Sequence, residues 1–468
     1  MKLTPIRRNV PTLALAAILG FQLFVPPSIG LANNNDFPKV IGIFSLGAPV
    51  KDVFEYADLK YQFDARYHYQ SGFYSSEALL AGAAIGLNNM FSKDGSFDLR
   101  WMGLVHGLLF LLAVYLLQSL VADLVRWRFF LWTAIIAFFG DVMYVSYFNS
   151  FYMDAAAYVF LMLSVVLFLR CVAWRRKSDA ACLVICVTLM LLAKTQHAIL
   201  GLWIAPLFGF FGGSLWPSNR RFFAIVSTAI VLAATILSVE ASPSSYAARG
   251  YYSVIFWQVL PHSTNVKADL EALGLDQSYA KFIGTHAYSA ESGFRNPEFA
   301  GVFMGRTSYS RLGWYFLNHP RDAYIALRTS LEEGGRQRPT LGNFDRSSGL
   351  PAFTESQAFA YWSNAKRMLF DGRGVRYLNC FLTMTLLTCA MATGGRKTLP
   401  GVLVAGIYSL AGMGLTEMLV ASLADAIDVT RHYFIAAAIL DVELLIVLWM
   451  LVSRMPSGLN HRFDPKSP

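Results

Sequence analysis

The sequence predicts an all-α polytopic membrane protein with about ten transmembrane helices. Of its 468 residues, 55% are hydrophobic and 15% are charged, whereas soluble domains carry about 25% charged residues. The mean hydropathy is +0.44. Apolar runs of membrane-spanning length begin near Thr12, Trp101, Phe129, Ala155, Ala181, Ala198, Phe222, Tyr377, Pro400 and His432. The run over residues 181–193 is the shortest of them.

The distribution of basic residues predicts the orientation of these spans. If the N-terminus is cytoplasmic, every inner segment carries two or more arginines or lysines, as the positive-inside rule expects. These residues are Arg7, Arg8, Arg126, Arg128, Arg175, Arg176, Lys177, Arg220, Arg221, Arg396, Lys397, Arg454 and Arg462. An even number of spans then returns the C-terminus to the cytoplasm. The net charge of +9 therefore reflects topology, and no nucleic-acid partner is expected.

This topology divides the chain into three parts. Residues 1–240 form an N-terminal transmembrane module whose first outer loop covers 33–100, residues 241–375 form a large, mostly helical outer loop, and residues 376–468 hold the C-terminal helices. Short outer turns lie at 149–154, 194–197 and 424–431. The first run could instead be a signal peptide cleaved near Ala32, but its length and Pro26-Pro27 favour an uncleaved anchor.

Ionisable residues gather at the predicted outer ends of several spans. Asp154 ends the segment YFNSFYMD (147–154), and Asp141 precedes it in the same apolar stretch. A carboxylate at a membrane boundary is costly unless it is hydrated, paired or functional. Other spans supply Lys194 and Arg431 at the same face. Any one of these residues could simply snorkel or cap a helix, but together they predict a functional site.

The residue types favour phosphate binding beside a general base. The expected catalytic carboxylates are Asp154, Asp64 and Asp141, and the expected residues for the substrate or a lipid phosphate are Arg431, His432, Lys194, Gln196, His197, Asn149 and Tyr147. Cationic side chains neutralise phosphate, while a carboxylate can deprotonate an acceptor hydroxyl. No metal signature, P-loop or GxGxxG motif occurs, so no cofactor is expected, although a divalent ion held by aspartate and water stays open. The five cysteines lie in or beside apolar runs and indicate no disulfide framework.

The order of several short motifs resembles the GT-C superfamily of polytopic membrane glycosyltransferases, most closely the bacterial hexose transferases of surface-glycan assembly. The motifs are YFNSFYMD (147–154), KTQH (194–197), YYSVIFWQVLPHS (251–263), LEALGL (270–275), IGT (283–285), FLNHP (316–320), LGN (341–343) and TRHYF (430–434). The resemblance implies a protein of the bacterial inner membrane with a periplasmic active site. Its implied partners are the bilayer, a polyprenyl-phosphate sugar donor, and a glycan or lipid-linked acceptor.

The same resemblance assigns roles to individual residues. Asp154 takes the acidic position of the second outer loop, Asp64 that of the first, and Arg431 matches the arginine that would hold the carrier phosphate. GT-C enzymes usually place their main acid soon after the first span, often as an adjacent pair. Here only Asp36 is that close, and no DD, DE or ED pair follows. Two alternatives stay open: a flippase or transporter for a lipid-linked glycan, and an O-antigen ligase or polymerase.

Overall fold

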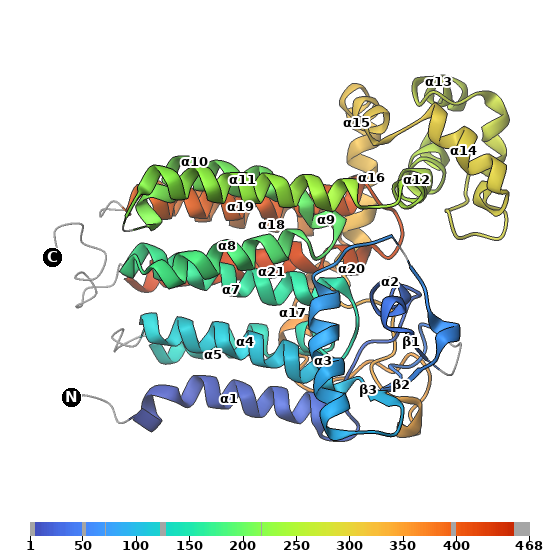
Figure 1. Cartoon of the computed structure of the whole chain (residues 1–468). Coiled ribbons are helices and arrows are strands. Elements are labelled where there is room, and N and C mark those ends of the chain that lie inside the picture. The colour runs from blue at the N-terminus through green and yellow to red at the C-terminus, as the bar shows by residue number, and fades with distance from the viewer. Residues whose placement is uncertain are drawn as a thin grey trace.

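A computed structural model describes residues 5–48, 53–70, 72–121, 128–216, 218–394 and 399–453. In these ranges, ten helices lie side by side in one bundle, at the positions that the apolar runs predict (Figure 1). They are α1 (Pro5–Phe24), α4 (Arg100–Val121), α5 (Arg128–Phe139), α7 (Met153–Trp174), α8 (Lys177–Leu191), α10 (Gly201–Leu215), α11 (Arg220–Glu240), α18 (Gly374–Thr393), α19 (Gly401–Leu423) and α21 (Phe434–Ser453). Within the described ranges, seven segments are long and apolar enough to cross a membrane, whereas α5, α8 and the apolar part of α1 are shorter. The predicted all-α polytopic fold is confirmed.

Burial along the bundle follows the composition of each helix. Helix α7 is apolar on all sides and contacts α4 and α8, so most of its residues are buried. Helices α10 and α11 approach closely because small residues face each other. A Cβ atom added to Gly212 would lie 3.2 Å from the Cα of Ala224. Small residues at such interfaces let helix backbones pack by van der Waals contact, which is what stabilises helix pairs in a membrane.

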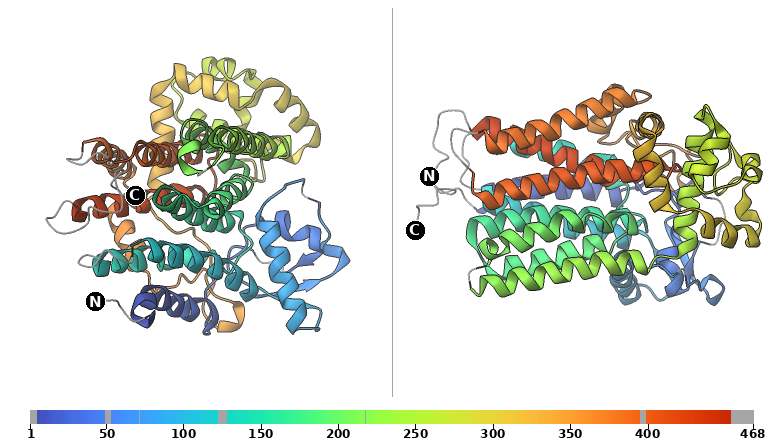
Figure 2. Two further views of the ribbon diagram at one scale, coloured as in Figure 1. Left: turned by 60° about the vertical axis from the view of Figure 1, so that its left-hand side comes forward. Right: turned by 90° about the horizontal axis from the view of Figure 1, so that it is seen from above.

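The two ends of the bundle differ. Helix α1 begins and α21 ends at the same end, as an even number of spans predicts, and the turns after α7 and α10 lie there too (Figure 1). Arg175, Lys177 and Arg220 belong to these turns or to the helices that follow them. Arg126, Arg396, Lys397, Arg454 and Arg462 lie outside the described residues. The opposite end, here called the outer end, carries the long loops (Figure 2).

The first outer loop forms a small folded cap on the outer end. It contains α2 (Pro38–Ile41), β1 (Leu46–Gly47), β2 (Lys60–Phe63), α3 (Glu77–Phe91) and β3 (Ser96–Asp98), with short 3-10 turns at Gly42–Phe44 and Ala65–Tyr67. The three short strands form an antiparallel sheet in the order β1-β2-β3, with Leu46 opposite Phe63 and Tyr61 opposite Phe97. Helix α3 packs on α4, and buried Glu77 lies 3.0 Å from His106 of α4.

The large outer loop has two parts with different contacts. The first contains α12 (Ser244–Ser253), a π-helical turn (Val254–Val259), α13 (Val266–Ala272), α14 (Pro297–Arg306), α15 (Tyr309–Asn318) and α16 (Pro320–Gly334), and it shares one aromatic-rich core. The second runs to α17 (Tyr361–Phe370) and pairs with the first outer loop, where the amide of Gly342 donates to the Phe54 carbonyl at 2.9 Å. Short turns α6 (Val142–Val145), α9 (Thr195–Ala198) and α20 (Val429–His432) complete the outer end.

Candidate functional site

Arg431 is the centre of a buried network of charged residues at the outer end. Each nitrogen of its guanidinium group meets a different carboxylate: Nη2 lies 2.6 Å from Asp36, Nη1 lies 3.2 Å from Asp154, and Nε lies 2.7 Å from Asp428. Only 4% of the arginine side chain is exposed. Every nitrogen of this buried guanidinium group is therefore paired with a carboxylate of the protein itself.

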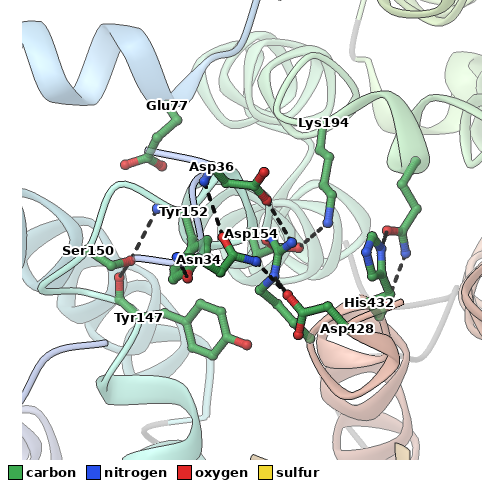
Figure 3. A network of polar contacts seen from close by, with 12 residues as sticks. Asn34, Asp36, Glu77, Tyr147, Ser150, Tyr152, Asp154, Lys194, Asp428 and His432 are labelled. Atoms are coloured by element: carbon green, nitrogen blue, oxygen red, sulfur yellow. Dashed lines mark hydrogen bonds and ion pairs between the residues drawn. The ribbon is translucent and has the colours of Figure 1, made fainter. Parts of the chain in front are cut away.

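Asp154 links this arginine to a second cation. The aspartate lies in the first turn of α7, where the helix dipole favours an acid. Its other oxygen lies 3.0 Å from Nζ of Lys194, which precedes α9, and 3.9 Å from Nε2 of His197. Only 1% of the Asp154 side chain is exposed. Asp154 is therefore a buried bridge between Lys194 and Arg431 (Figure 3).

The first outer loop completes the network from the other side. The Tyr152 hydroxyl donates to the carbonyl of Ala32 at 2.7 Å and accepts the amide of Asn34 at 3.0 Å. The Asn34 side chain donates to Asp428 at 2.6 Å. Asp36 also pairs with Lys39. These bonds join the start of the first outer loop, the turn before α7 and the turn before α20, which are far apart in the sequence (Figure 3).

A second series of hydrogen bonds, next to the network of Arg431, connects α9 with α19 and α20. The Gln196 amide nitrogen donates to Glu417 of α19 at 2.8 Å and to the backbone carbonyl of His432 at 2.9 Å. The other Glu417 oxygen lies 2.7 Å from Nδ1 of His197. The Gln196 amide oxygen lies 2.7 Å from Nδ1 of His432. This series therefore connects His197, which faces Asp154, to His432.

The electrostatics of the network follow from burial and these partners. Burial alone raises the pKa of Asp36, but Arg431 and Lys39 outweigh it and hold the pKa well below its usual range. Burial disfavours the charge on Arg431, yet Asp428, Asp36 and Asp154 raise its pKa well above the ordinary value. Burial, Lys194 and Arg431 lower the pKa of His432 well below its ordinary value. His432 is therefore neutral at physiological pH, whereas Asp36 and Arg431 are charged.

Four of the residues predicted from the sequence lie outside this network. Asp64 caps an exposed 3-10 turn and pairs with Arg66 at 2.5 Å. Asp141 is fully buried and accepts three backbone amides, from Met143, Trp362 and Ser363. The Asn149 amide donates to the carbonyls of Leu23 and Ile29, at 3.0 and 2.8 Å. Tyr147 stacks on Phe434 with ring centroids 4.0 Å apart. These contacts give the four residues structural partners.

The structure adds residues that the sequence-based choice omitted, namely Asn34, Asp36, Lys39, Glu417, Asp425 and Asp428. Four of them carried a signal. Asp425 and Asp428 belong to the polar segment that opens the last span. Asp36 is the first acid after the first span, and Glu417 is an acid inside an apolar run, where a charge is costly without a partner. Asn34 and Lys39 carried none, because their importance comes from distant partners. Within the described part of the chain, no group of three or more His, Cys, Asp or Glu residues is placed to hold a metal ion.

The fold and the network define a multi-pass α-helical membrane protein with a buried charged site at one end of its bundle. The chain belongs to the family described as the YfdI N-terminal transmembrane domain, which matches residues 4–465. No curated protein and no solved structure matches the chain.

Proposed function

We propose that the protein is a glycosyltransferase of the bacterial inner membrane, which moves a hexose from a polyprenyl-phosphate carrier to a glycan or lipid-linked acceptor at the periplasmic face. The observation that carries the proposal is the convergence of Arg431, Lys194 and Lys39 with carboxylates from separate loops in one buried network. Cations and acids held this close together can bind a phosphate leaving group beside a base.

The donor phosphate would bind Arg431 by replacing one of its carboxylates. Of the three acids on Arg431, Asp428 has the most exposed side chain, at 24%, against 13% for Asp36 and 1% for Asp154. The second partner of Asp428 is the neutral amide of Asn34, whereas those of Asp36 and Asp154 are lysines, and this amide can retain Asp428 when Arg431 turns to phosphate. A phosphate at this position would be neutralised as the bond to the sugar breaks, which stabilises the transition state.

The location of the network supports transfer over transport. Its members lie at the outer end of the bundle, on or beside outer turns, whereas transporters place their binding sites near the bilayer midplane (Figure 1). A phosphate held at the outer ends of the helices leaves the polyprenyl chain in the bilayer. The sugar would then meet the two outer loops.

The test supplies the purified, reconstituted protein with a polyprenyl-phosphate hexose and with native membrane lipid and glycan as acceptor. Labelled hexose should appear in the acceptor fraction. Arg431→Ala should abolish this transfer, whereas the matched control Asp276→Asn, an exposed acid paired with Arg306 in the large loop, should retain it. The Arg431→Ala variant must elute from a size-exclusion column at the same volume as the wild type, which shows that it is folded. If this folded variant kept full transfer, the site assignment would be wrong.

A further inference from the structure

Asp425 and His432 form a pair beside the charged network of Arg431. The proposed binding of the donor does not use this pair. Asp425 lies in the turn after α19, and His432 ends α20. Nε2 of the histidine lies 3.6 Å from Oδ2 of the aspartate. The aspartate side chain is 28% exposed, whereas the histidine is 7% exposed. The pair therefore combines one accessible carboxylate with one fixed imidazole ring.

The hydrogen bonds of Gln196 determine the tautomer of His432. The amide nitrogen of Gln196 lies against two acceptors, the Glu417 carboxylate and the His432 carbonyl, so its NH₂ group must point there. The amide oxygen then faces Nδ1 of His432 at 2.7 Å, and Nδ1 must donate. In a neutral imidazole with a hydrogen on Nδ1, Nε2 carries the lone pair. Nε2 is thus an acceptor that faces Asp425.

The charges around His432 keep it in this neutral form. Burial is the largest cause that lowers the pKa of His432 well below its ordinary value. The cations Lys194, Arg431 and Lys39 lower it further, as does His197. The histidine therefore adds no positive charge to a phosphate site, which revises the role expected from the sequence. Its contribution is a lone pair at a fixed place.

The surroundings of Asp425 give it a different character. Burial raises its pKa to about 6, although the Ile427 amide, Lys194 and Arg431 lower it, and Asp428 raises it further. The Ile427 amide donates to Oδ1 at 3.1 Å, which leaves Oδ2 for another donor. A base is most effective when its pKa lies near the working pH. Asp36, whose pKa is held far lower, is a weaker base.

Asp425 also lies between the charged network and the large outer loop. Tyr309 of α15 donates to the carbonyl of Ala424 at 2.7 Å, and Ala426 packs into the aromatic core of that loop. Burial raises the pKa values of Tyr246 and Tyr288 in the same region, and the charge of Asp425 raises them further. Arg431, on the other side, belongs to the first-loop network. An acceptor lying on the large loop would therefore reach Asp425 first.

We propose that Asp425 and His432 receive the hydroxyl group of the sugar acceptor and take its proton during transfer. This inference rests on the proposed function and names the acceptor side of the same site. The acceptor is identified by its chemistry as a hydroxyl group of a glycan or glycolipid, which donates its hydrogen bond between Nε2 and Oδ2. Both atoms are acceptors and lie 3.6 Å apart, so together they can receive the hydrogen of one neutral hydroxyl group, whereas an anion has no hydrogen to donate to them.

The step balances without a cofactor. The hydroxyl oxygen forms the new bond to the anomeric carbon, and the bond from that carbon to the phosphate oxygen breaks. The electron pair of the broken bond leaves with the polyprenyl phosphate, which Arg431 and Lys194 neutralise. The hydroxyl proton passes to the Asp425–His432 pair and from there to water at the exposed edge of the aspartate.

The test measures transfer from polyprenyl-phosphate hexose by wild type, Asp425→Asn, His432→Asn and Asp276→Asn between pH 5 and 8. A base must be deprotonated, so the kcat of the wild type should rise with pH through a midpoint near 6, set by Asp425. Asp425→Asn should lower kcat about 10²- to 10⁴-fold with the donor KM unchanged. Its kcat should no longer fall as the pH decreases below 6. His432→Asn keeps an N–H toward Gln196 but lacks Nε2, and should lower kcat with the donor KM also unchanged.

Three outcomes of this test would contradict the proposal. If Asp425→Asn kept the wild-type kcat and pH profile, the pair would not be the base. If both variants raised the donor KM and left kcat unchanged, the pair would belong to the donor site and the proposal would fail. If the wild type transferred no sugar while it bound polyprenyl phosphate, the proposed function itself would fall and this inference with it.

Discussion

Removing the charge of Asp154 tests whether the network holds the outer end of the bundle together. The carboxylate lies 3.0 Å from Lys194 and 3.2 Å from Arg431. With an effective dielectric constant of about 20, each contact corresponds to about 5 kcal/mol of Coulomb attraction. Most of this attraction is offset by the cost of burying the charges. Asp154→Asn keeps the shape of the side chain and removes only its charge.

The expected loss is therefore the cost of leaving a buried cation without its partner, about 3–5 kcal/mol in the free energy of unfolding. Arg431 retains Asp36 and Asp428, so most of the loss comes from Lys194. The double variant Asp154→Asn, Lys194→Met removes both charges and should recover part of this stability, with a coupling energy of at least about 1 kcal/mol.

The assay is reversible unfolding of the purified protein in mixed detergent micelles, followed by circular dichroism. Asp276→Asn is the matched control, since its carboxylate is half exposed and pairs with Arg306 at the surface, and it should unfold as the wild type does. The reasoning would be refuted if Asp154→Asn lay within about 0.5 kcal/mol of the wild type, the range of ordinary surface substitutions, or if the double variant equalled the sum of the single ones.

Three further substitutions test other contacts at the outer end, all by the same unfolding measurement. Asn149→Ala should cost about 2 kcal/mol or more, because two buried backbone carbonyls lose their donor; an unchanged midpoint would show that the carbonyls find other donors. Gly103→Ala should destabilise by about 1–3 kcal/mol, since its Cβ would lie 2.1 Å from the Asn149 amide oxygen; a neutral result would mean that α4 shifts freely. Lys366→Met should destabilise, because it leaves buried Asp441 without its cation, and Asp441→Asn in the same chain should restore part of the loss.

The bundle could be predicted from the sequence because membrane spans have a strong local signal. Each apolar run became a helix near its expected start, since a backbone in lipid must satisfy its own hydrogen bonds. The weak run at 181–193 became α8, which is one of the shorter helices. The short outer turns at 149–154, 194–197 and 424–431 were also placed correctly relative to the helices.

The pairing of charged residues could not be predicted in the same way. Asp64 and Asp36 both lie in the first outer loop, yet Asp36 reaches Arg431 and Asp64 remains on the surface with Arg66. The difference arises from the bonds of Asn34 and Tyr152, which hold residues 32–36 against α7. Asp141 has the same explanation, since two of the three amides that donate to it, those of Trp362 and Ser363, lie more than two hundred residues away. Contacts between residues so far apart leave no pattern in the local sequence from which they could be predicted.

His432 shows how geometry changes a residue's assigned chemistry. Beside Arg431 in the sequence, it was expected to help neutralise phosphate. Its ring instead donates to Gln196 and turns a lone pair toward Asp425. Since the surrounding cations keep it neutral, the same histidine suits a hydroxyl group.

The most direct test of the central claim follows both halves of the donor in reconstituted vesicles. Polyprenyl-phosphate hexose carries one label on the sugar and another on the phosphate, and native membrane lipid and glycan supply the acceptor. The account predicts that each hexose moved to the acceptor releases one polyprenyl phosphate, and that Arg431→Ala abolishes both signals together. Intact donor that crosses to the opposite leaflet with its two labels still joined would contradict the account and identify a flippase.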